Sequence, residues 1–264
     1  MKPSARSNYD LAASSFEYHR PLPSHAVEAI RATIWSVVRP PEQTRVLDVG
    51  AGTGRIGQVF AAAGAIYAGV DSSLAMLMEF SRKPAFQEWK TCLLAQADGR
   101  ELPFPNASFN VVLLMQVLSG SGAWREILEE CRRVLRSGGV IVAGHMKSPE
   151  SGTDVQLRHR LRAILEEMQI AWHQPSESRR EALAWLESAA AKHWHREAAF
   201  WNVSSSVEEF FLRHRTGARF AALPCSVQDE ALRRLQAWLE MHPAIMKSNN
   251  LEERHSFELD IFEF

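Results

Sequence analysis

The sequence has little cysteine, almost no excess charge and no long apolar run. Its 264 residues include three cysteines, which are scattered at Cys92, Cys131 and Cys225. An odd and scattered set fits a reducing compartment and forms neither a disulfide framework nor a zinc knuckle, so we expect a cytoplasmic protein. Lys and Arg number 30 against 31 for Asp and Glu. This near-neutral balance disfavours a dedicated nucleic-acid binder.

Membrane insertion is also disfavoured. No run approaches the about 18 consecutive apolar residues that a spanning helix needs. Residues 1–10 are polar and lack the apolar core of a secretory signal. The 46% hydrophobic and 23% charged residues are an ordinary globular balance, which excludes wholesale disorder. The length predicts one large domain, or one domain with an insertion.

Glycine, histidine and tryptophan are unevenly distributed. Twelve of the 14 glycines lie between Gly50 and Gly144, whereas eight of the 10 histidines and five of the eight tryptophans lie from His145 onward. The first part alternates short apolar runs with amphipathic stretches. Strand candidates are residues 45–49, 67–70, 92–97, 109–115 and 140–144. Helical spacing marks residues 27–38 and 124–135, the second expected to end at Gly138-Gly139. This alternation predicts a parallel sheet with helices on both faces.

The second part carries helix-start signals and two strand candidates. Capping-box pairs are Thr153/Gln156, Ser178/Glu181, Ser206/Glu209 and, more weakly, Ser226/Asp229. Residues 193–203 resemble a strand. In residues 255–264, apolar side chains alternate with charged ones, which predicts a half-buried antiparallel strand.

The most informative stretch is residues 46–55, which read VLDVGAGTGR. A buried strand runs directly into Gly50, Gly52 and Gly54, and a helix follows. Glycines allow a sharp turn and a close approach of the backbone to a ligand. The amides at the following helix N-terminus favour negative charge, so we expect an anionic or carboxylate-bearing ligand in front of this loop.

Residues 52–57 also match the dinucleotide-binding fingerprint, with Asp71 about 20 residues further on. The register disfavours this interpretation. The first glycine of the fingerprint ends the strand, and here that residue is Gly50. The third glycine then falls at Arg55, where a side chain would crowd a pyrophosphate. An NAD-dependent oxidoreductase therefore stays open as the alternative function.

Three successive strands each deliver a carboxylate at or near their carboxyl end: Asp48, Asp71 and Asp98. That edge is where open α/β sheets bind ligands. The constellation resembles the class I S-adenosylmethionine-dependent methyltransferases, and within them the type 11 set related to ubiquinone and menaquinone biosynthesis. The residues that carry the resemblance are Leu47-Asp48-Val49-Gly50-Ala51-Gly52-Thr53-Gly54, Val70-Asp71-Ser72 with Met76, Ala97-Asp98-Gly99, Leu102-Pro103-Phe104 before Phe109-Asn110-Val111-Val112, and Val134-Leu135-Arg136-Ser137-Gly138-Gly139.

The resemblance covers roughly residues 9–145 and the closing strands. It implies an α/β, Rossmann-like fold with a seven-stranded, mostly parallel sheet, an antiparallel last strand and helices on both faces. We expect a single domain over residues 1–264. Its parts are an N-terminal lid (1–40), a cofactor-binding core (41–150), helical cap inserts (151–175 and 205–250) and sheet closure (176–204 and 251–264).

The resemblance also implies roles for individual residues toward S-adenosylmethionine. Gly50, Ala51 and Gly52, with Asp48 before them, would hold the methionine part, and Asp71 would take both ribose hydroxyls. The residues implied around the adenosine are Ser72, Met76, Ala97, Asp98 and Gly99. Gln116 and Val117 would lie near the sulfonium, and Arg20 of the lid would reach the cofactor carboxylate. Relatives often carry a histidine near Ser119. Its absence here leaves open a catalytically silent cofactor-binding protein.

Candidates for acceptor chemistry are weaker. His145, at a strand end, is a candidate general base. His193 and His195 alternate on one strand face but have no third ligand, so no metal is predicted. Two arginine-rich clusters, residues 158–162 and 213–219, are either solvated or bind an acidic group. We therefore expect a small-molecule acceptor with an apolar or aromatic body and, if the arginines bind it, an acidic group.

Overall fold

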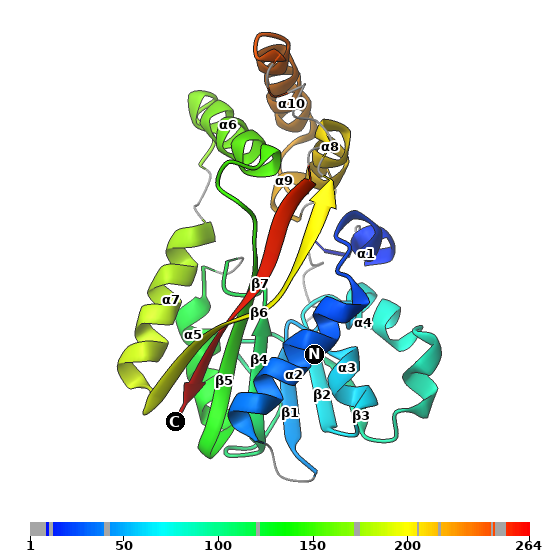
Figure 1. Cartoon of the computed structure of the whole chain (residues 1–264), viewed down its shortest axis with the longest axis vertical. Helices are drawn as coiled ribbons and strands as arrows, with labels where there is room; N and C mark the ends of the chain where they lie inside the picture. The colour runs from blue at the N-terminus through cyan, green and yellow to red at the C-terminus, as the bar shows by residue number, and fades with distance from the viewer. Residues whose placement is uncertain are drawn as a thin grey trace.

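The computed structural model describes residues 9–10, 13–39, 43–119, 122–171, 175–204, 206–215, 218–243, 245 and 252–264. A seven-stranded sheet runs through the centre of the molecule (Figure 1). Its strands, in chain order, are β1 (Arg45–Val49), β2 (Ile66–Asp71), β3 (Cys92–Gln96), β4 (Phe109–Met115), β5 (Leu135–Lys147), β6 (Lys192–Ser204) and β7 (Glu252–Glu263).

The strand order is β3-β2-β1-β4-β5-β7-β6. The first five strands pair in parallel, and β7 pairs antiparallel with both β5 and β6. The order reverses direction at β1, whose neighbours are β2 and β4. A crevice outside the carboxyl ends of the strands forms at such a reversal. The expected Rossmann-like sheet with an antiparallel last strand is confirmed.

The prediction of a half-buried last strand is wrong, because helices cover both faces of β7, α2 on one side and α7 on the other. Phe257, Leu259 and Ile261 pack into the core on one face of the sheet, and Phe262 packs into the core on the other. The alternating charged residues are buried as well, since Glu258 and Asp260 are 6% and 5% exposed.

Helices cover both faces of the sheet. On one face lie α2 (Ser24–Val38), α3 (Gln58–Ala62) and α4 (Leu74–Ser81), whose apolar side chains share a core with β1, β4, β5 and β7. On the other lie α5 (Trp124–Val134) and α7 (Pro175–Ala189). Short turns complete this part: η1 (Ala13–Ser15), α1 (Phe16–His19) and η2 (Pro84–Glu88). The helices on each face therefore exclude water from that side of the apolar sheet.

Four further helices pack on one another instead of on the sheet: α6 (Thr153–Glu167), α8 (Val207–Arg215), α9 (Ala218–Ala221) and α10 (Cys225–Glu240). Their apolar faces meet in a separate core that includes Leu161, Phe210 and Leu235. Figure 1 shows them at the top of the molecule, where the long strands β6 and β7 reach beyond the rest of the sheet. In the described part of the chain, no helix is long and apolar enough to cross a membrane.

Only one of the four predicted capping boxes forms. The Ser206 hydroxyl accepts from the Glu209 N–H at 3.1 Å, and the Glu209 carboxylate accepts from the Ser206 N–H at 3.2 Å. α6 is preceded by Gly152, which leaves Thr153 inside the helix. α7 begins at Pro175 and α10 at Cys225, so Ser178 and Ser226 also lie inside their helices. Pro175 is the first residue of α7, and Pro224 is the N-cap of α10. Both helices therefore begin at a proline or next to one, before the serines.

The predicted end of the 124–135 helix at Gly138-Gly139 is also wrong. α5 ends at Val134, and β5 begins at the next residue. Gly138 lies within β5 at φ +74° and donates its N–H to the carbonyl of Phe264. The glycine pair therefore shapes the start of the strand next to the chain terminus rather than the end of the helix.

The capping box of α8 can be tested with a matched pair of serines. Ser206→Ala removes the acceptor of the Glu209 N–H and should lower the free energy of unfolding by about 1 kcal/mol. Ser226→Ala, at a serine inside α10, should change it by less than about 0.5 kcal/mol. Urea denaturation measures both, and equal losses in the two variants would contradict the assignment.

Candidate functional site

The turn after β1 is made of glycines in conformations that other residues rarely adopt. Gly50, Gly52 and Gly54 have φ angles of +79°, +56° and +72°. A Cβ at Gly50 would lie 2.6 Å from a methyl carbon of Val117. A Cβ at Gly52 would meet nothing closer than the terminal methyl of Met76 at 3.9 Å and an Asp71 carboxylate oxygen at 4.0 Å. The loop is thus tightly packed against Val117 at Gly50, whereas a ligand can approach its backbone closely at Gly52.

Backbone hydrogen bonds fix this loop to the end of β2. The N–H groups of Gly50 and Ala51 both donate to the carbonyl of Val70, at 2.8 and 2.9 Å. The Gly52 N–H donates to Asp71 Oδ2 at 2.9 Å, and the Ser73 N–H donates to Asp71 Oδ1 at 2.8 Å. Asp71 therefore joins the glycine loop to the start of α4. Burial raises its pKa, and the backbone hydrogen bonds oppose that rise.

Asp48 points beneath the loop. It is 2% exposed, and its Oδ2 accepts a hydrogen bond from the Tyr67 hydroxyl at 2.8 Å. The same oxygen lies 2.7 Å from where a Cβ on Gly57 would be, so it faces the start of α3. Burial raises the pKa of Asp48 to about 7. The structure thus places Asp48 under the glycine loop, on the side covered by α3, where it supports the turn.

Asp98 lies on the outer side of the same edge. Its carboxylate forms a two-pronged ion pair with Arg100, at 3.0 and 2.6 Å, which lowers its pKa. Ala97 donates its N–H to the carbonyl of Asp71 at 3.0 Å, so the ends of β2 and β3 are joined. A Cβ on Gly99 would lie 3.3 Å from the Val49 side chain. Asp98 and Gly99 therefore border the loop from the β3 side.

The remaining predicted cofactor residues differ in exposure. Met76 is 3% exposed and packs beside Gly52, whereas Ser72 is exposed. Gln116 follows β4 at φ +63°, and its side-chain carbonyl accepts a hydrogen bond from Arg55 Nη2 at 2.9 Å. Val117 packs against Gly50. The sheet edge thus brings the residues predicted from β1, β2, β3 and β4 around one loop.

Sequence reasoning missed the residues that tie the N-terminal segment to this loop. Glu17 accepts hydrogen bonds from the Thr53 hydroxyl at 2.6 Å and from Lys83 Nζ at 2.9 Å. Arg55 Nη1 donates to the carbonyl of Arg20. Arg55 directly follows the glycine loop, but on sequence grounds it was considered only as an obstacle to a pyrophosphate. Its position in the turn between the glycine loop and α3 is the available signal.

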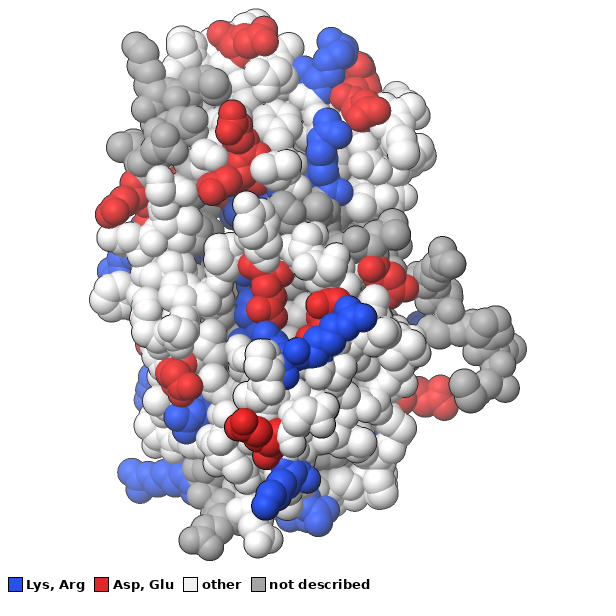
Figure 2. Space-filling view, turned by 90° about the vertical axis from the view of Figure 1, so that its right-hand side faces the viewer, with Lys and Arg blue, Asp and Glu red and all other residues white. Residues whose placement is uncertain are grey.

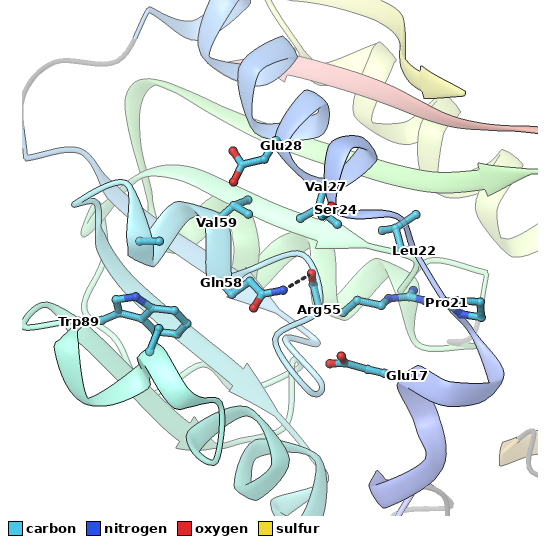
Figure 3. Close-up of a pocket in the computed structure, with 12 residues that line it drawn as sticks. Glu17, Pro21, Leu22, Ser24, Val27, Glu28, Arg55, Gln58, Val59 and Trp89 are labelled. Atoms are coloured by element: carbon cyan, nitrogen blue, oxygen red, sulfur yellow. Dashed lines mark hydrogen bonds between the residues drawn. The ribbon is translucent and has the colours of Figure 1, made fainter. Parts of the chain in front are cut away.

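A cavity of about 540 Å³ lies outside the loop. Figure 3 shows it between the connection that leads into α2, the helix α3 and the indole of Trp89. Arg55 and Glu17 face it, with Val27 and Val59 among its apolar lining. None of Asp71, Asp98 and Gln116 lines it, so it is separate from the predicted cofactor contacts.

His145 belongs to a polar group between β5, β6, β7 and α7. Its Nδ1 is buried without a hydrogen-bond partner, and burial together with the nearby Arg179 lowers its pKa to about 4. Such an imidazole is neutral at pH 7 and can accept a hydrogen bond, but it is a weak general base. His193 and His195 both contact Asp260, at 3.2 and 2.9 Å. Over the described ranges, no group of three or more His, Cys, Asp or Glu side chains is arranged to hold a metal ion.

Part of the chain matches a protein-family model. Residues 47–143 match the family model described as a methyltransferase domain. Among curated relatives, a demethylmenaquinone methyltransferase of Clavibacter sepedonicus is 28% identical over 204 residues, which cover 74% of this chain and 81% of that protein. One of Parafrankia sp. (strain EAN1pec) is 35% identical over 120 residues, 40% of this chain and 47% of that protein. A malonyl-[acyl-carrier protein] O-methyltransferase of Enterobacter lignolyticus (strain SCF1) is 27% identical over 141 residues, 53% of this chain and 52% of that protein. The chain thus spans about half the length of most of these relatives.

Solved structures share the fold. The YcgJ protein of Bacillus subtilis matches with a TM-score of 0.58 and 16% identity, covering 91% of this chain and 98% of that one. An S-adenosylmethionine-dependent methyltransferase of Geobacter sulfurreducens in complex with S-adenosylhomocysteine matches with a TM-score of 0.53 and 17% identity, covering 97% and 98%. At these identities the likeness establishes the fold.

The buried carboxyl under the loop makes stability depend on pH. The folded pKa of Asp48 is about 7 against 3.8 for the free group, so the folded state keeps a proton that the unfolded state loses. Its contribution is present below about pH 4 and is lost as pH rises toward 7, by up to about 4 kcal/mol. Asp48→Asn carries no titrating proton. Its free energy of unfolding, relative to wild type, should therefore rise by a few kcal/mol between pH 4 and pH 8.

Urea denaturation at a series of pH values measures this difference, with Asp98→Asn as control. Asp98 is half-exposed and its pKa is lowered, so its removal should give a small change in the opposite sense. Parallel stability curves for wild type and Asp48→Asn would show that Asp48 is ionised in the folded protein.

Proposed function

We propose that the chain is an S-adenosylmethionine-dependent methyltransferase that transfers the cofactor's methyl group to a small-molecule acceptor; the match of residues 47–143 to a methyltransferase domain supports this. The observation that carries the proposal is the joint geometry of the glycine loop and Asp71. The open space at Gly52 lets a ligand approach the backbone closely. The Asp71 carboxylate, 4.0 Å from where a Cβ on Gly52 would be, can accept hydrogen bonds from hydroxyl groups of that ligand. The relatives named as methyltransferases support the same activity.

The residues present fit the cofactor. Gly50, Ala51 and Gly52 would hold its methionine part through the backbone, and Asp71 would accept from its ribose hydroxyls. Ser72, Met76, Ala97, Asp98 and Gly99 would border the adenosine, with Asp98 accepting from the adenine amino group. Asp98 must then exchange part of its pairing with Arg100 for the ligand. This exchange is feasible because the pair is half-exposed and its net contribution small.

Gln116 and Val117 would lie beside the sulfonium. When bound there, the cofactor would supply a methyl group activated by its positively charged sulfur. The protein's part is to align acceptor and methyl, which can contribute roughly 7–11 kcal/mol. The Arg55–Gln116 hydrogen bond fixes the side chain nearest that point.

We propose that residues 151–175 and 205–250 form a cap that selects the acceptor, over a core of residues 41–150 with a lid at 1–40. The separate packing of α6, α8 and α10 beyond the sheet edge supports this division. Two relatives are named as methyltransferases of a demethylmenaquinone and of a malonyl-[acyl-carrier protein]. These names support the proposal that the acceptor is small or carries a small reacting group. Residues 176–204 and 251–264 would then close the sheet through β6 and β7, with α7 covering one face.

Surface charge and the cysteines bear on the kind of acceptor and on the cellular compartment. On the face drawn in Figure 2, acidic and basic side chains are interspersed rather than gathered into a basic area, which supports a small-molecule acceptor over nucleic acid. The thiols of Cys92, Cys131 and Cys225 are free, which supports a cytoplasmic setting.

Calorimetric titration with S-adenosylhomocysteine and with NAD tests the proposal. Wild type should bind the first and not the second. Asp71→Ala removes a charged hydrogen-bond acceptor and should weaken S-adenosylhomocysteine binding 10- to 100-fold, since such a bond contributes about 1.5–3 kcal/mol. Glu101→Ala, at an exposed carboxylate beyond β3, should leave the affinity unchanged.

Because Asp71 also accepts from the Gly52 N–H, thermal unfolding should accompany each titration to show that the variants are folded at the temperature used. Unchanged affinity in a folded Asp71→Ala, or tighter binding of NAD than of S-adenosylhomocysteine, would overturn the proposed function.

A further inference from the structure

Two guanidinium groups meet where the glycine loop, the N-terminal segment and the α6–α10 helices come together. Arg55 reaches from the loop to Gln116 at 2.9 Å and to the carbonyl of Arg20. Arg20 donates through Nη2 to the carbonyl of Arg213 in α8 at 3.4 Å, and its Nη1 is buried without a partner. Figure 1 shows α1, just before Arg20, beside α8. This set thus links the loop to the helices above it.

Neither Arg20 nor Arg55 forms an ion pair within 4.0 Å with any carboxylate that the structure describes. Acids in this region have other partners, although the nearby charge of Glu17 also favours the charged form of Arg55. Glu17 holds Lys83 and the Thr53 hydroxyl, Asp154 holds Arg213 and Arg158, and Glu253 accepts from the Thr153 N–H. The two guanidiniums are left with carbonyl and amide oxygens as acceptors.

Burial makes this arrangement costly. Arg20 and Arg55 are both largely covered, and burial lowers the pKa of each. A buried cation without an anion loses hydration that carbonyl oxygens only partly replace. Such sites are favourable when a ligand brings the missing anion, and a guanidinium pairs with a carboxylate or phosphate through two parallel hydrogen bonds.

The cofactor supplies one such anion, its carboxylate, whereas two guanidiniums lack one. Arg55 leaves the glycine loop itself and contacts Gln116, the residue proposed beside the sulfonium. Arg20 contacts α8, the proposed acceptor cap. Arg55 therefore reaches the end of β4, and Arg20 reaches α8.

We propose that the acceptor carries a carboxylate or phosphate group, which binds between Arg20 and Arg213 under the cap, while Arg55 lies on the side of the cofactor carboxylate. This inference rests on the proposed function, and it moves Arg20 from the cofactor, where the resemblance put it, to the acceptor. Arg213 keeps its ion pair with Asp154 and contributes a second guanidinium edge. A neutral acceptor would leave the Arg20 charge unpaired.

The test separates the cofactor from the acceptor. The protein is first saturated with S-adenosylhomocysteine, which fills the cofactor's own carboxylate position. Sodium benzoate and inorganic phosphate are then titrated as probes of the two anion types. We expect at least one of them to bind. Arg20→Gln and Arg213→Gln should each weaken that binding at least tenfold while S-adenosylhomocysteine affinity changes less than threefold.

Arg215→Gln is the matched control, because Arg215 lies on the same helix α8 with its side chain 58% exposed and only a 4.0 Å contact to Asp229. It should bind the probe like wild type. Benzamide, which has the ring of benzoate without the charge, should bind at least tenfold more weakly than benzoate.

Arg213 pairs with a buried acid, so Arg213→Gln on its own could lose binding by unfolding. The Arg20→Gln variant decides in that case, because Arg20 has no carboxylate partner to lose. If wild type binds S-adenosylhomocysteine but neither probe, or binds a probe equally well in Arg20→Gln, the inference is wrong and the proposed function stands. If S-adenosylhomocysteine itself does not bind, the proposed function fails first.

Discussion

The structure depends on the junction between the glycine loop and the end of β2. Two amides of the loop donate to one carbonyl of β2, and a third donates to the carboxylate of Asp71. The positive φ angles that make this possible exclude a side chain at Gly50, where Val117 fills the space. Asp48 and Tyr67 support the turn from below. The surface in front of the loop is thus held in place by hydrogen bonds and packing within the protein itself.

Charged side chains around this junction fall into two sets. Asp71 and Asp98, at and just beyond the ends of β2 and β3, are the carboxylates proposed to accept hydrogen bonds from the nucleoside. Arg20 and Arg55 link the N-terminal segment, the glycine loop and α8, and they are proposed to bind anionic groups. In the proposed complex, carboxylates therefore meet the nucleoside and guanidiniums meet the anionic groups.

Much of this follows from the sequence because it depends on local pattern. The glycine spacing, the apolar runs and the acids after three strands predict the sheet and the loop within a few residues. What fails depends on distant partners. β7 alternates like a strand with one solvent-facing side, yet α2 covers one of its faces and α7 covers the other. Ser178 and Ser226 look like caps, but their helices begin upstream of them, α7 at Pro175 and α10 at Cys225. The pairing of Arg20 with α8 joins residues 193 positions apart, which no spacing rule encodes.

The most direct test of the central claim is amide hydrogen exchange with and without S-adenosylhomocysteine. A ligand in front of the loop should slow exchange at residues 50–54, 71–76, 97–99 and 116–117, which come from four strands and meet only in the folded site. Residues 21–28 and 58–62, which line the cavity outside the loop, should change little. Protection of the cavity residues with no change at the loop would contradict the account.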